Sequence, residues 1–330
     1  MATKNRTVAQ SENAYNQWKE IWTTHAKYHS RFAPFKPMSD FMNIGVGKAC
    51  LIVANGYSFE EHAEIIKAHA NNVDILCCDK TLGHLLDMGI KPTYCLVADA
   101  MVDYEKYMKP YKDQLDGTIL FMTITGNMKW SANGNWKDKY FVVNHDAIGT
   151  EKEFSAISGC NNLIAAGTNV SNAMVVLLTQ SDNTGRKNFF GYDKMLLIGF
   201  DYSWLLDGKY YAFDETGNGK SNYMRHIYIV STRGRHGFTS LNLHFSADWL
   251  RNYVINFKLP VVNCSPDSIL SIPYTGKLEQ QMQYNFRPED SAFVRAELEK
   301  RDKLAKEVQD INNRVLNIGT EHYYKFLATI

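Results

Sequence analysis

The sequence predicts an α/β fold in which an open, mostly parallel, Rossmann-like sheet carries helices on both faces. Helical appendages are expected at both ends of the chain. Two observations lead to this prediction. Short runs of almost wholly apolar residues recur along the sequence, as expected of strands that are buried on both faces. Each run is followed by a turn of Gly, Asn, Asp or Ser and then by a helical pattern, which is typical of a parallel sheet.

The composition is that of a globular protein, with 330 residues, 45% hydrophobic and 22% charged. A net charge of +1 argues against a strongly basic surface for nucleic acid. No apolar run approaches the roughly 20 residues of a membrane span, and the polar N-terminus lacks a signal-peptide core. The six cysteines show no CxxC spacing and mostly lie in strand-like runs, which indicates small reduced core residues. We therefore expect a cytoplasmic protein with no membrane contact.

The first element along the chain is a helix expected over residues 9–30. Its aromatic side chains recur at helical spacing and form one stripe. The stripe consists of Tyr15, Trp18, Trp22 and His25. This pattern indicates a helix that docks onto the main domain, with a partner-binding helix as the alternative. Pro34 and Pro37 then prevent its continuation.

The strand–helix alternation begins at residue 49. Apolar runs predict strands at 49–54, 73–78, 94–98, 119–124, 140–144, 194–198 and 260–263. Helices are expected from Ser58 to about residue 71, where Glu61 completes a capping box, and then at 81–88, 169–179 and 246–257. Residues 202–240 are rich in Gly, Tyr, Asn and Arg, and we interpret them as a long loop or lid.

Three segments follow from this pattern, namely an N-terminal helical segment 1–40, a Rossmann-like nucleotide-binding domain 41–275 and a C-terminal helical segment 276–330. The last of these carries an amphipathic helix over 288–317. That helix is expected to pack against the body of the protein, and formation of a homo-oligomer is the alternative.

Two glycine-rich stretches look like phosphate loops but do not meet the requirements of one. The run from Gly45 to Lys48 precedes a strand instead of following it. The run from Gly217 to Ser221 ends like a Walker A motif, but Asp214 stands where the first glycine belongs and no apolar strand precedes it.

Polar residues that follow the predicted strands carry more information. The turn Asn55, Gly56 and Ser58 follows the first strand, and Gly56 permits a tight turn before the free N–H groups of a helix. Three later strands end at acidic residues, namely Asp79, Asp99 and Asp201. Parallel strands place all these groups on one edge of the sheet, where such folds bind nucleotides. Each aspartate alone could equally be a helix or turn cap.

Two further segments are candidates for ligand contact. Gly167, Thr168 and Asn169 form a polar start to a helix and could hold a phosphate, a ribose or a base, the alternative being a well-capped buried helix. The 202–240 segment mixes basic and aromatic side chains, which suits a phosphate-bearing ligand, the alternative being a solvated loop. Its His226 and His236 are candidate general acids or bases, because histidine titrates near neutral pH.

Taken in order, these motifs resemble those of a known superfamily over residues 45–270. The matching stretches are Ala54-Asn-Gly-Tyr-Ser58, Asp79 with Leu85-Leu-Asp-Met-Gly-Ile-Lys-Pro92, Val97-Ala-Asp99, Gly167-Thr-Asn-Val-Ser-Asn-Ala173 and Leu197-Ile-Gly-Phe-Asp201. The chain resembles the superfamily of the motility accessory factor glycosyltransferases of flagellated bacteria and the archaeal-type 6-hydroxymethylpterin diphosphokinases. It departs from the usual pattern at Ala54, where the family has glycine, and at Tyr57, where it has proline.

The resemblance implies a fold similar to that of sialyltransferases that use a cytidine-monophosphate-linked sugar. Its glycosyltransferase members are thought to transfer nonulosonic acids to protein hydroxyls. Its diphosphokinase members move a diphosphate from ATP to a pterin hydroxymethyl group with Mg²⁺. Fold alone does not choose between these activities.

We therefore expect a transferase that uses a nucleotide-sugar donor, CMP- or UDP-linked, and a hydroxyl acceptor on a protein, a glycan or a modified nucleobase. The turn at Gly56 and the helix start at Gly167 would hold the nucleotide, and Asp99 or Asp201 would orient the ribose or activate the acceptor. The alternative enzyme is a diphosphokinase in which Asp79, Asp99 and Asp201 hold Mg²⁺. A non-catalytic nucleotide-binding or interaction module is the third hypothesis.

Overall fold

The computed structural model describes residues 2–146, 148–165, 169–179, 188–205, 209–213, 226–230 and 235–283. Two of the expected contact residues, Gly167 and Thr168, lie outside the described residues. The C-terminal helix expected over 288–317, and with it the expected role in a homo-oligomer, also lies outside them.

The described residues form an eight-stranded sheet in the order β11-β7-β1-β2-β3-β4-β5-β6, and all its pairings are parallel. Its strands are β1 Ala49–Val53, β2 Asp74–Cys78, β3 Tyr94–Val97, β4 Ile119–Thr123, β5 Asp138–His145, β6 Leu163–Ala165, β7 Lys194–Ile198 and β11 Val261–Asn263. The predicted parallel α/β fold is thus confirmed. The short strand β6 was not expected.

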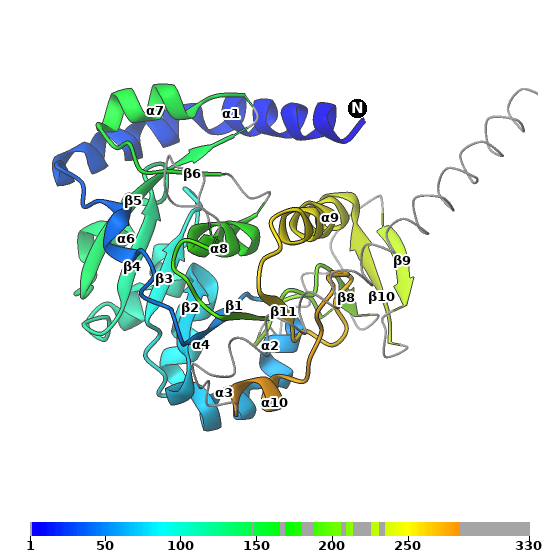
Figure 1. The fold of residues 1–330 in the computed structure, drawn as a ribbon. Coiled ribbons are helices and arrows are strands. Elements are labelled where there is room, and N and C mark those ends of the chain that lie inside the picture. The colour runs from blue at the N-terminus through cyan, green and yellow to red at the C-terminus, as the bar shows by residue number, and fades with distance from the viewer. Residues whose placement is uncertain are drawn as a thin grey trace, which may run out of the picture. The chain divides into compact units, whose positions relative to one another are not determined.

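The strand order reverses direction between β1 and β7. The chain runs outward from β1 to β6 and then returns to the opposite side of β1, where β7 and β11 complete the sheet (Figure 1). Connections that leave β1 and β7 therefore diverge and leave room beyond the carboxyl ends of these strands. In open α/β sheets this switch point is where ligands bind.

Helices cover both faces of the sheet because neighbouring residues of each strand point to opposite sides. Cys50 and Ile52 of β1 pack in the cluster with α8 Val170–Thr179 and α9 Leu241–Asn256. Leu51 and Val53 pack in the other cluster. The helices on that second side include α2 Tyr57–Glu61, α3 Ala63–His69, α4 Asp79–Asp87, α5 Tyr104–Tyr107, α6 Met128–Asn133, α7 Glu151–Ser158 and α10 Leu278–Met282 (Figure 1).

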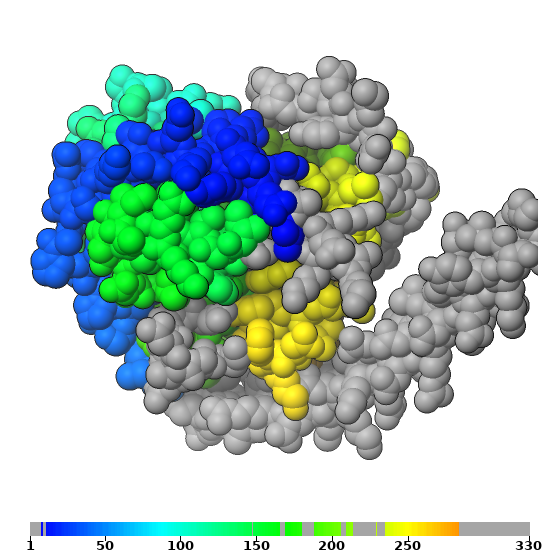
Figure 2. Space-filling view, turned by 90° about the horizontal axis from the view of Figure 1, so that it is seen from above, coloured from blue at the N-terminus to red at the C-terminus, as the bar shows by residue number. Residues whose placement is uncertain are grey.

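The N-terminal helix α1 Ala2–His29 docks onto the main body, as its aromatic stripe predicts. The hydroxyl of Tyr15 donates to Glu153 on α7 at 2.5 Å, and the Trp22 ring meets Phe154 edge-on at 6.0 Å. His25 Nδ1 donates to the Thr125 carbonyl at 3.1 Å. Figure 2 shows the blue helix lying along the green segment that contains α7.

The segment 202–240 differs from the loop that the sequence suggested. Its described parts contribute β8 Trp204–Leu205, β9 His226–Val230 and β10 His236–Ser240 to an antiparallel sheet in the order β8-β10-β9. The β9–β10 pairing supplies backbone hydrogen bonds that local sequence does not reveal. Helix α9 also starts five residues earlier than expected, because the Ser240 side chain accepts a hydrogen bond from the Leu243 amide.

All six cysteines are buried and free, as the sequence predicts. Among the described helices, none combines the length and the apolar character that a membrane span requires.

Candidate functional site at the carboxyl edge of the sheet

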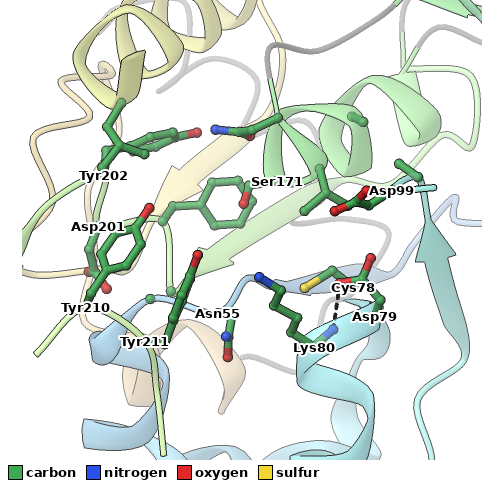
Figure 3. A pocket seen from close by; sticks show the side chains of 18 of the residues that line it. Asn55, Cys78, Asp79, Lys80, Asp99, Ser171, Asp201, Tyr202, Tyr210 and Tyr211 are labelled. Carbon is green, nitrogen blue, oxygen red and sulfur yellow. Dashed lines mark hydrogen bonds between the residues drawn. The ribbon is translucent and has the colours of Figure 1, made fainter. Parts of the chain in front are cut away.

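A cavity of about 520 Å³ lies at the carboxyl edge of the sheet, at the predicted switch point. The segments that follow β1, β2, β3 and β7 line it, together with the start of α8 and Tyr210 and Tyr211 (Figure 3). The sequence-predicted residues that the fold brings together here are Asn55, Gly56, Asp79, Asp99, Asn169 and Asp201. These residues are up to 146 positions apart in the sequence. They lie close together because they follow the carboxyl ends of parallel strands, which meet at one edge of the sheet.

Asp79 is one of two buried aspartates in the lining of the cavity. It begins α4 directly after β2 and is only 2% exposed. One carboxylate oxygen accepts a hydrogen bond from the Lys80 amide at 2.7 Å, and the other has no partner among the described residues. The pKa of Asp79 is raised from 3.8 to about 7, chiefly by burial and to a smaller extent by the charge of Asp99, while Lys80 opposes the shift. This carboxyl group can therefore exchange a proton near neutral pH.

Asp99 lies on the same side of the cavity as Asp79 but in a different environment (Figure 3). It follows β3, it is exposed, and one of its oxygens accepts a hydrogen bond from the Met101 amide at 2.8 Å. The two carboxylates repel each other when both are ionised. A proton or a cation between them would remove this repulsion.

Asp201 lies across the cavity and closes the start of helix α2 (Figure 3). Its Oδ2 accepts a hydrogen bond from the Ser58 amide at 2.9 Å, while its Oδ1 is buried without a partner among the described residues. Burial raises its pKa to about 7, although the hydrogen bonds from Ser58 oppose this. The Ser58 amide belongs to the helix start that was predicted to bind a phosphate. In the structure this amide already donates to the carboxylate of Asp201.

The glycines at this place are required by the close approach of two strand ends. A Cβ at Gly56 would lie 2.2 Å from the carboxylate of Asp201, and a Cβ at Gly199 would lie 1.9 Å from the Ala54 carbonyl oxygen. Gly199 also has a φ of +75°, which disfavours other residues. Ser58 is fully buried, and its hydroxyl accepts a hydrogen bond from the Gly199 amide at 3.0 Å. These contacts hold the ends of β1 and β7 together.

Unpartnered polar atoms are concentrated in this cavity. Seven buried side-chain nitrogen or oxygen atoms of the described residues lack a hydrogen-bond partner, and four of them belong to residues that line it. The four are Asn55 Oδ1, Asp79 Oδ2, Asn144 Oδ1 and Asp201 Oδ1. A buried polar group without a partner costs about 1–3 kcal/mol. Ordered water or the hydroxyl and amino groups of a ligand would remove this cost, and these atoms make the cavity a candidate binding site.

The remaining predicted site residues contribute less to this cavity. Asn169 lines it, and its side chain accepts a hydrogen bond from the Asn172 amide at 2.9 Å, which caps α8. His236 is exposed on β10 and does not line the cavity. His226 lies in β9, and its side chain is not among the described ones.

Sequence reasoning missed several lining residues that the structure adds, and three of them have side chains that suit ligand contact. Asn144 lies at the end of the apolar run of β5 and lines the cavity. Its place at a strand end was the signal that could have predicted its contact with the site. Lys80 directly follows Asp79, and Trp22 belongs to the aromatic stripe of α1. Neither carries a local mark of ligand contact, because only the fold places them at the cavity.

A second cavity of about 430 Å³ continues from the first. The two share Trp22, Asp99 and Asn144 among other lining residues, and α1 forms one wall of the second. Trp18 and Phe154 add further aromatic surface, whereas no lysine, arginine or histidine of the described residues lines it. This second cavity suits an uncharged group with both apolar and hydroxyl surfaces.

The three aspartates expected to hold Mg²⁺ in the diphosphokinase hypothesis do not form one cluster. Among the described residues, no group of three or more histidine, cysteine, aspartate or glutamate side chains could hold a metal ion. Asp79 and Asp99 remain as a pair of carboxylates on the same side of the cavity. Because Mg²⁺ often binds through one or two carboxylates plus substrate phosphates, this pair fits a metal that arrives with its substrate.

The fold and the cavity define a Rossmann-like α/β protein with a candidate ligand site at its topological switch point. Residues 23–206 match the family described as 6-hydroxymethylpterin diphosphokinase MptE-like. This match covers more than half of the chain, and the chain belongs to that family. The superfamily resemblance drawn from the motifs is thereby confirmed.

Among solved structures, the chain is similar to the structure of MAf glycosyltransferase from Magnetospirillum magneticum AMB-1. The TM-score is 0.55 at 14% sequence identity, over 87% of this chain and 42% of that protein. The likeness therefore shows a common fold, and this chain spans less than half of the length of that relative. No curated protein sequence matches the chain. Family and fold together indicate a transferase at this coarse level.

Proposed function

We propose that this protein is a transferase that moves a glycosyl group from a nucleotide-activated donor to an acceptor hydroxyl. The observation that carries this proposal is the buried carboxyl group of Asp79, whose unpartnered oxygen belongs to the cavity and whose pKa is raised to about 7. A general base works best when its pKa lies near the working pH.

In the proposed reaction Asp79 accepts the proton of the acceptor hydroxyl. The acceptor oxygen then bonds to the anomeric carbon of the donor while the bond from that carbon to the leaving phosphate oxygen breaks. The proton ends on Asp79, and the electron pair leaves with the nucleotide phosphate. Asp99 next to Asp79 favours proton uptake, because a second negative charge disfavours the ionised form of Asp79.

The donor would occupy the central cavity. Its unpartnered acceptor atoms, which include the oxygens of Asn55 and Asp201, suit the hydroxyl groups of a ribose or a sugar. Tyr210 and Tyr211 lie with ring centroids 4.3 Å apart and offer aromatic surface to a base. We keep CMP- and UDP-linked sugars as the candidate donors.

The acceptor would occupy the second cavity, which adjoins the first at Asp99 and Asn144. Trp18 and Trp22 supply a flat apolar wall there, and Asn144 Oδ1 supplies an unpartnered hydrogen-bond acceptor. A hydroxyl-bearing group of a glycan, a protein side chain or a modified nucleobase would meet these requirements. Its reacting hydroxyl would point toward the central cavity.

The second candidate function is a Mg²⁺-dependent diphosphokinase acting on a hydroxymethyl group. The family match and the Asp79–Asp99 pair favour it. These two residues would hold the metal, and the metal would neutralise charge on the transferred phosphates. In this case ATP binds only when Mg²⁺ is present.

The test measures calorimetric binding of CMP, UDP, GDP and ATP, each with and without Mg²⁺. It then measures release of nucleotide from CMP- and UDP-linked sugars with a set of hydroxyl acceptors. Metal-independent binding of CMP or UDP together with turnover supports the glycosyltransferase. Binding of ATP alone, and only with Mg²⁺, contradicts it and supports the diphosphokinase. Tight binding without turnover of any donor would indicate a non-catalytic nucleotide-binding module.

The variant Asp79→Asn tests the proposed base, with Asp113→Asn as the matched control. Asp113 carries the same functional group on a side chain that is 79% exposed. We expect the Asp79 variant to lose about 10²- to 10⁴-fold in turnover, as is usual for a missing general base. Donor binding should persist, because Asn retains an oxygen for the Lys80 amide. Full activity of this variant would contradict the assigned role.

A further inference from the structure

A third, smaller pocket of about 110 Å³ opens beside the central cavity and has the opposite electrostatic character. It lies among the end of β1, helix α4 and the α5 region, and it shares Asn55, Lys80 and Tyr211 with the central cavity. We call it the basic side pocket. Its chemically active lining consists of Lys80, His84, Lys106, Tyr107, Tyr111 and Tyr211.

Positive charge is concentrated in this pocket. No aspartate or glutamate among the described residues lines it, and neither Lys80 nor Lys106 forms an ion pair with a described residue. Each ammonium group instead faces an aromatic ring, with Lys80 Nζ 4.7 Å from the centre of Tyr211 and Lys106 Nζ 4.8 Å from the centre of Tyr107. Such contacts hold a lysine in place without an ion pair. The charge of Lys80 is partly offset by its neighbour Asp79, whereas Lys106 has no such neighbour in the described lining of the pocket.

The central cavity has the reverse character. Two of its unpartnered buried atoms are carboxylate oxygens and two are amide oxygens, so it offers acceptors to a ligand. Lys80 is the cationic side chain in its described lining, and the second cavity has none. Asp201 already binds the amide of Ser58 at the start of α2. An anionic group therefore meets repulsion in most of the cleft and attraction in the basic side pocket.

From this arrangement we infer that the basic side pocket is an anion subsite that takes the phosphate or diphosphate group of the ligand whose remainder fills the central cavity. The identification of that ligand as a nucleotide rests on the proposed function, whereas the preference for phosphate rests on the pocket itself. Lys80 contributes to both spaces and would contact the phosphate nearest to the reacting centre. Lys106 would contact the outer phosphate oxygens.

This subsite also fixes the direction of the ligand along the cleft. The phosphate lies at the basic side pocket, and the nucleoside and the transferred group extend from it into the central cavity. The transferred group lies beside Asp79, and the acceptor approaches from the cavity walled by α1. An anionic acceptor would be excluded from that last cavity, because Asp99 lines it and no described cationic side chain does.

The test measures binding of inorganic pyrophosphate, cytidine, CMP and CDP by calorimetry at constant ionic strength, in wild type and in Lys106→Gln. The matched control is Lys109→Gln, because Lys109 lies one turn further on, is exposed and pairs with Glu105 at 2.7 Å. We expect the Lys106 variant to bind pyrophosphate and CDP about fivefold or more weakly, with cytidine binding unchanged. The Lys109 variant should resemble wild type, and thermal melting should show both variants folded.

The anion subsite would be overturned if wild type and Lys106→Gln bound pyrophosphate with equal affinity. It would also be overturned if no pyrophosphate bound up to 10 mM, a concentration on the order of the weakest useful affinities. Neither result would affect the transferase proposal. Pyrophosphate binding that depends on Lys106 but is accompanied by no nucleotide binding would support the subsite and contradict the nucleotide donor. Displacement of CDP by pyrophosphate would support both. These outcomes separate failure of the subsite from failure of the proposed function.

Discussion

Replacing Asp79 by asparagine should stabilise the protein and inactivate it at the same time. The folded state raises the pKa of this carboxyl from 3.8 to about 7, chiefly through burial. Because the raised pKa belongs to an acid, the folded state favours the protonated form. The contribution of Asp79 to the stability of wild type is therefore most favourable below pH 4 and becomes less favourable as the pH rises from about 4 to about 7.

The magnitude follows from the size of this shift. One pKa unit corresponds to about 1.36 kcal/mol, so ionised Asp79 destabilises the folded state by about 4 kcal/mol above pH 7 and by about 2 kcal/mol at pH 5. Asparagine is neutral at both pH values and retains an oxygen for the Lys80 amide. The gain in stability from Asp79→Asn should thus be roughly 2 to 3 kcal/mol larger at pH 8 than at pH 5.

Urea unfolding of wild type, Asp79→Asn and the exposed control Asp113→Asn at pH 5 and pH 8 measures this difference. In parallel, kcat/KM of wild type should rise about tenfold per pH unit below pH 7 and level off above it. A change in stability that is the same at both pH values would refute the reasoning, since Asp79 would then titrate at its ordinary pKa in the folded protein.

Three further predictions concern the acceptor cavity, the strand-end contact and the docking of α1. Trp18→Ala should raise the KM for the acceptor about tenfold with donor affinity unchanged, because it removes aromatic surface from the second cavity. Steady-state kinetics measure this effect, and Tyr28→Ala is the control because Tyr28 does not line that cavity. Gly199→Ala should lower the free energy of unfolding by about 3 kcal/mol or more, because its Cβ would lie 1.9 Å from the Ala54 carbonyl oxygen. The control Gly47→Ala has a similar φ but open space around it, and it should lose only about 1 kcal/mol in the same urea titration. His29 is buried and its pKa is lowered to about 4, so its contribution to the stability of wild type should fall by about 3 kcal/mol as the pH falls from 6.5 to 4. The stability of His29→Gln relative to wild type should therefore be higher at pH 4.5 than at pH 7 in unfolding curves.

Most of the sheet was predictable from local sequence. The apolar runs that predict β1, β2, β3, β4, β5, β7 and β11 mark them because strands covered on both faces need side chains that tolerate burial on both sides. The two-stranded pairing of β9 and β10 was not predictable in this way. The two strands are held by hydrogen bonds to each other, which no local pattern reveals. The sequence around them mixes glycine with charged residues, so it shows no clear strand pattern.

The candidate site was predictable as a place but not as a chemical arrangement. Parallel strand ends bring Asp79, Asp99 and Asp201 to one edge, as the sequence implied. The basic side pocket was missed, because Lys106 lies 26 residues beyond Lys80 on a different helix. The wall that α1 contributes to the second cavity was also missed. A stripe of aromatic residues predicts that a helix packs against something, but not which cavity lies beside it.

The sequence by itself determined that an open parallel sheet forms and that acidic residues gather where its strands end. Those features depend on local patterns of apolar and polar residues. Only the tertiary structure decided that Asp79 is buried with a free oxygen, that Asp99 is exposed, and that Asp201 binds the amide of Ser58. The physical reason is that desolvation and charge interactions depend on the segments that pack above a strand end, and those segments come from distant parts of the chain.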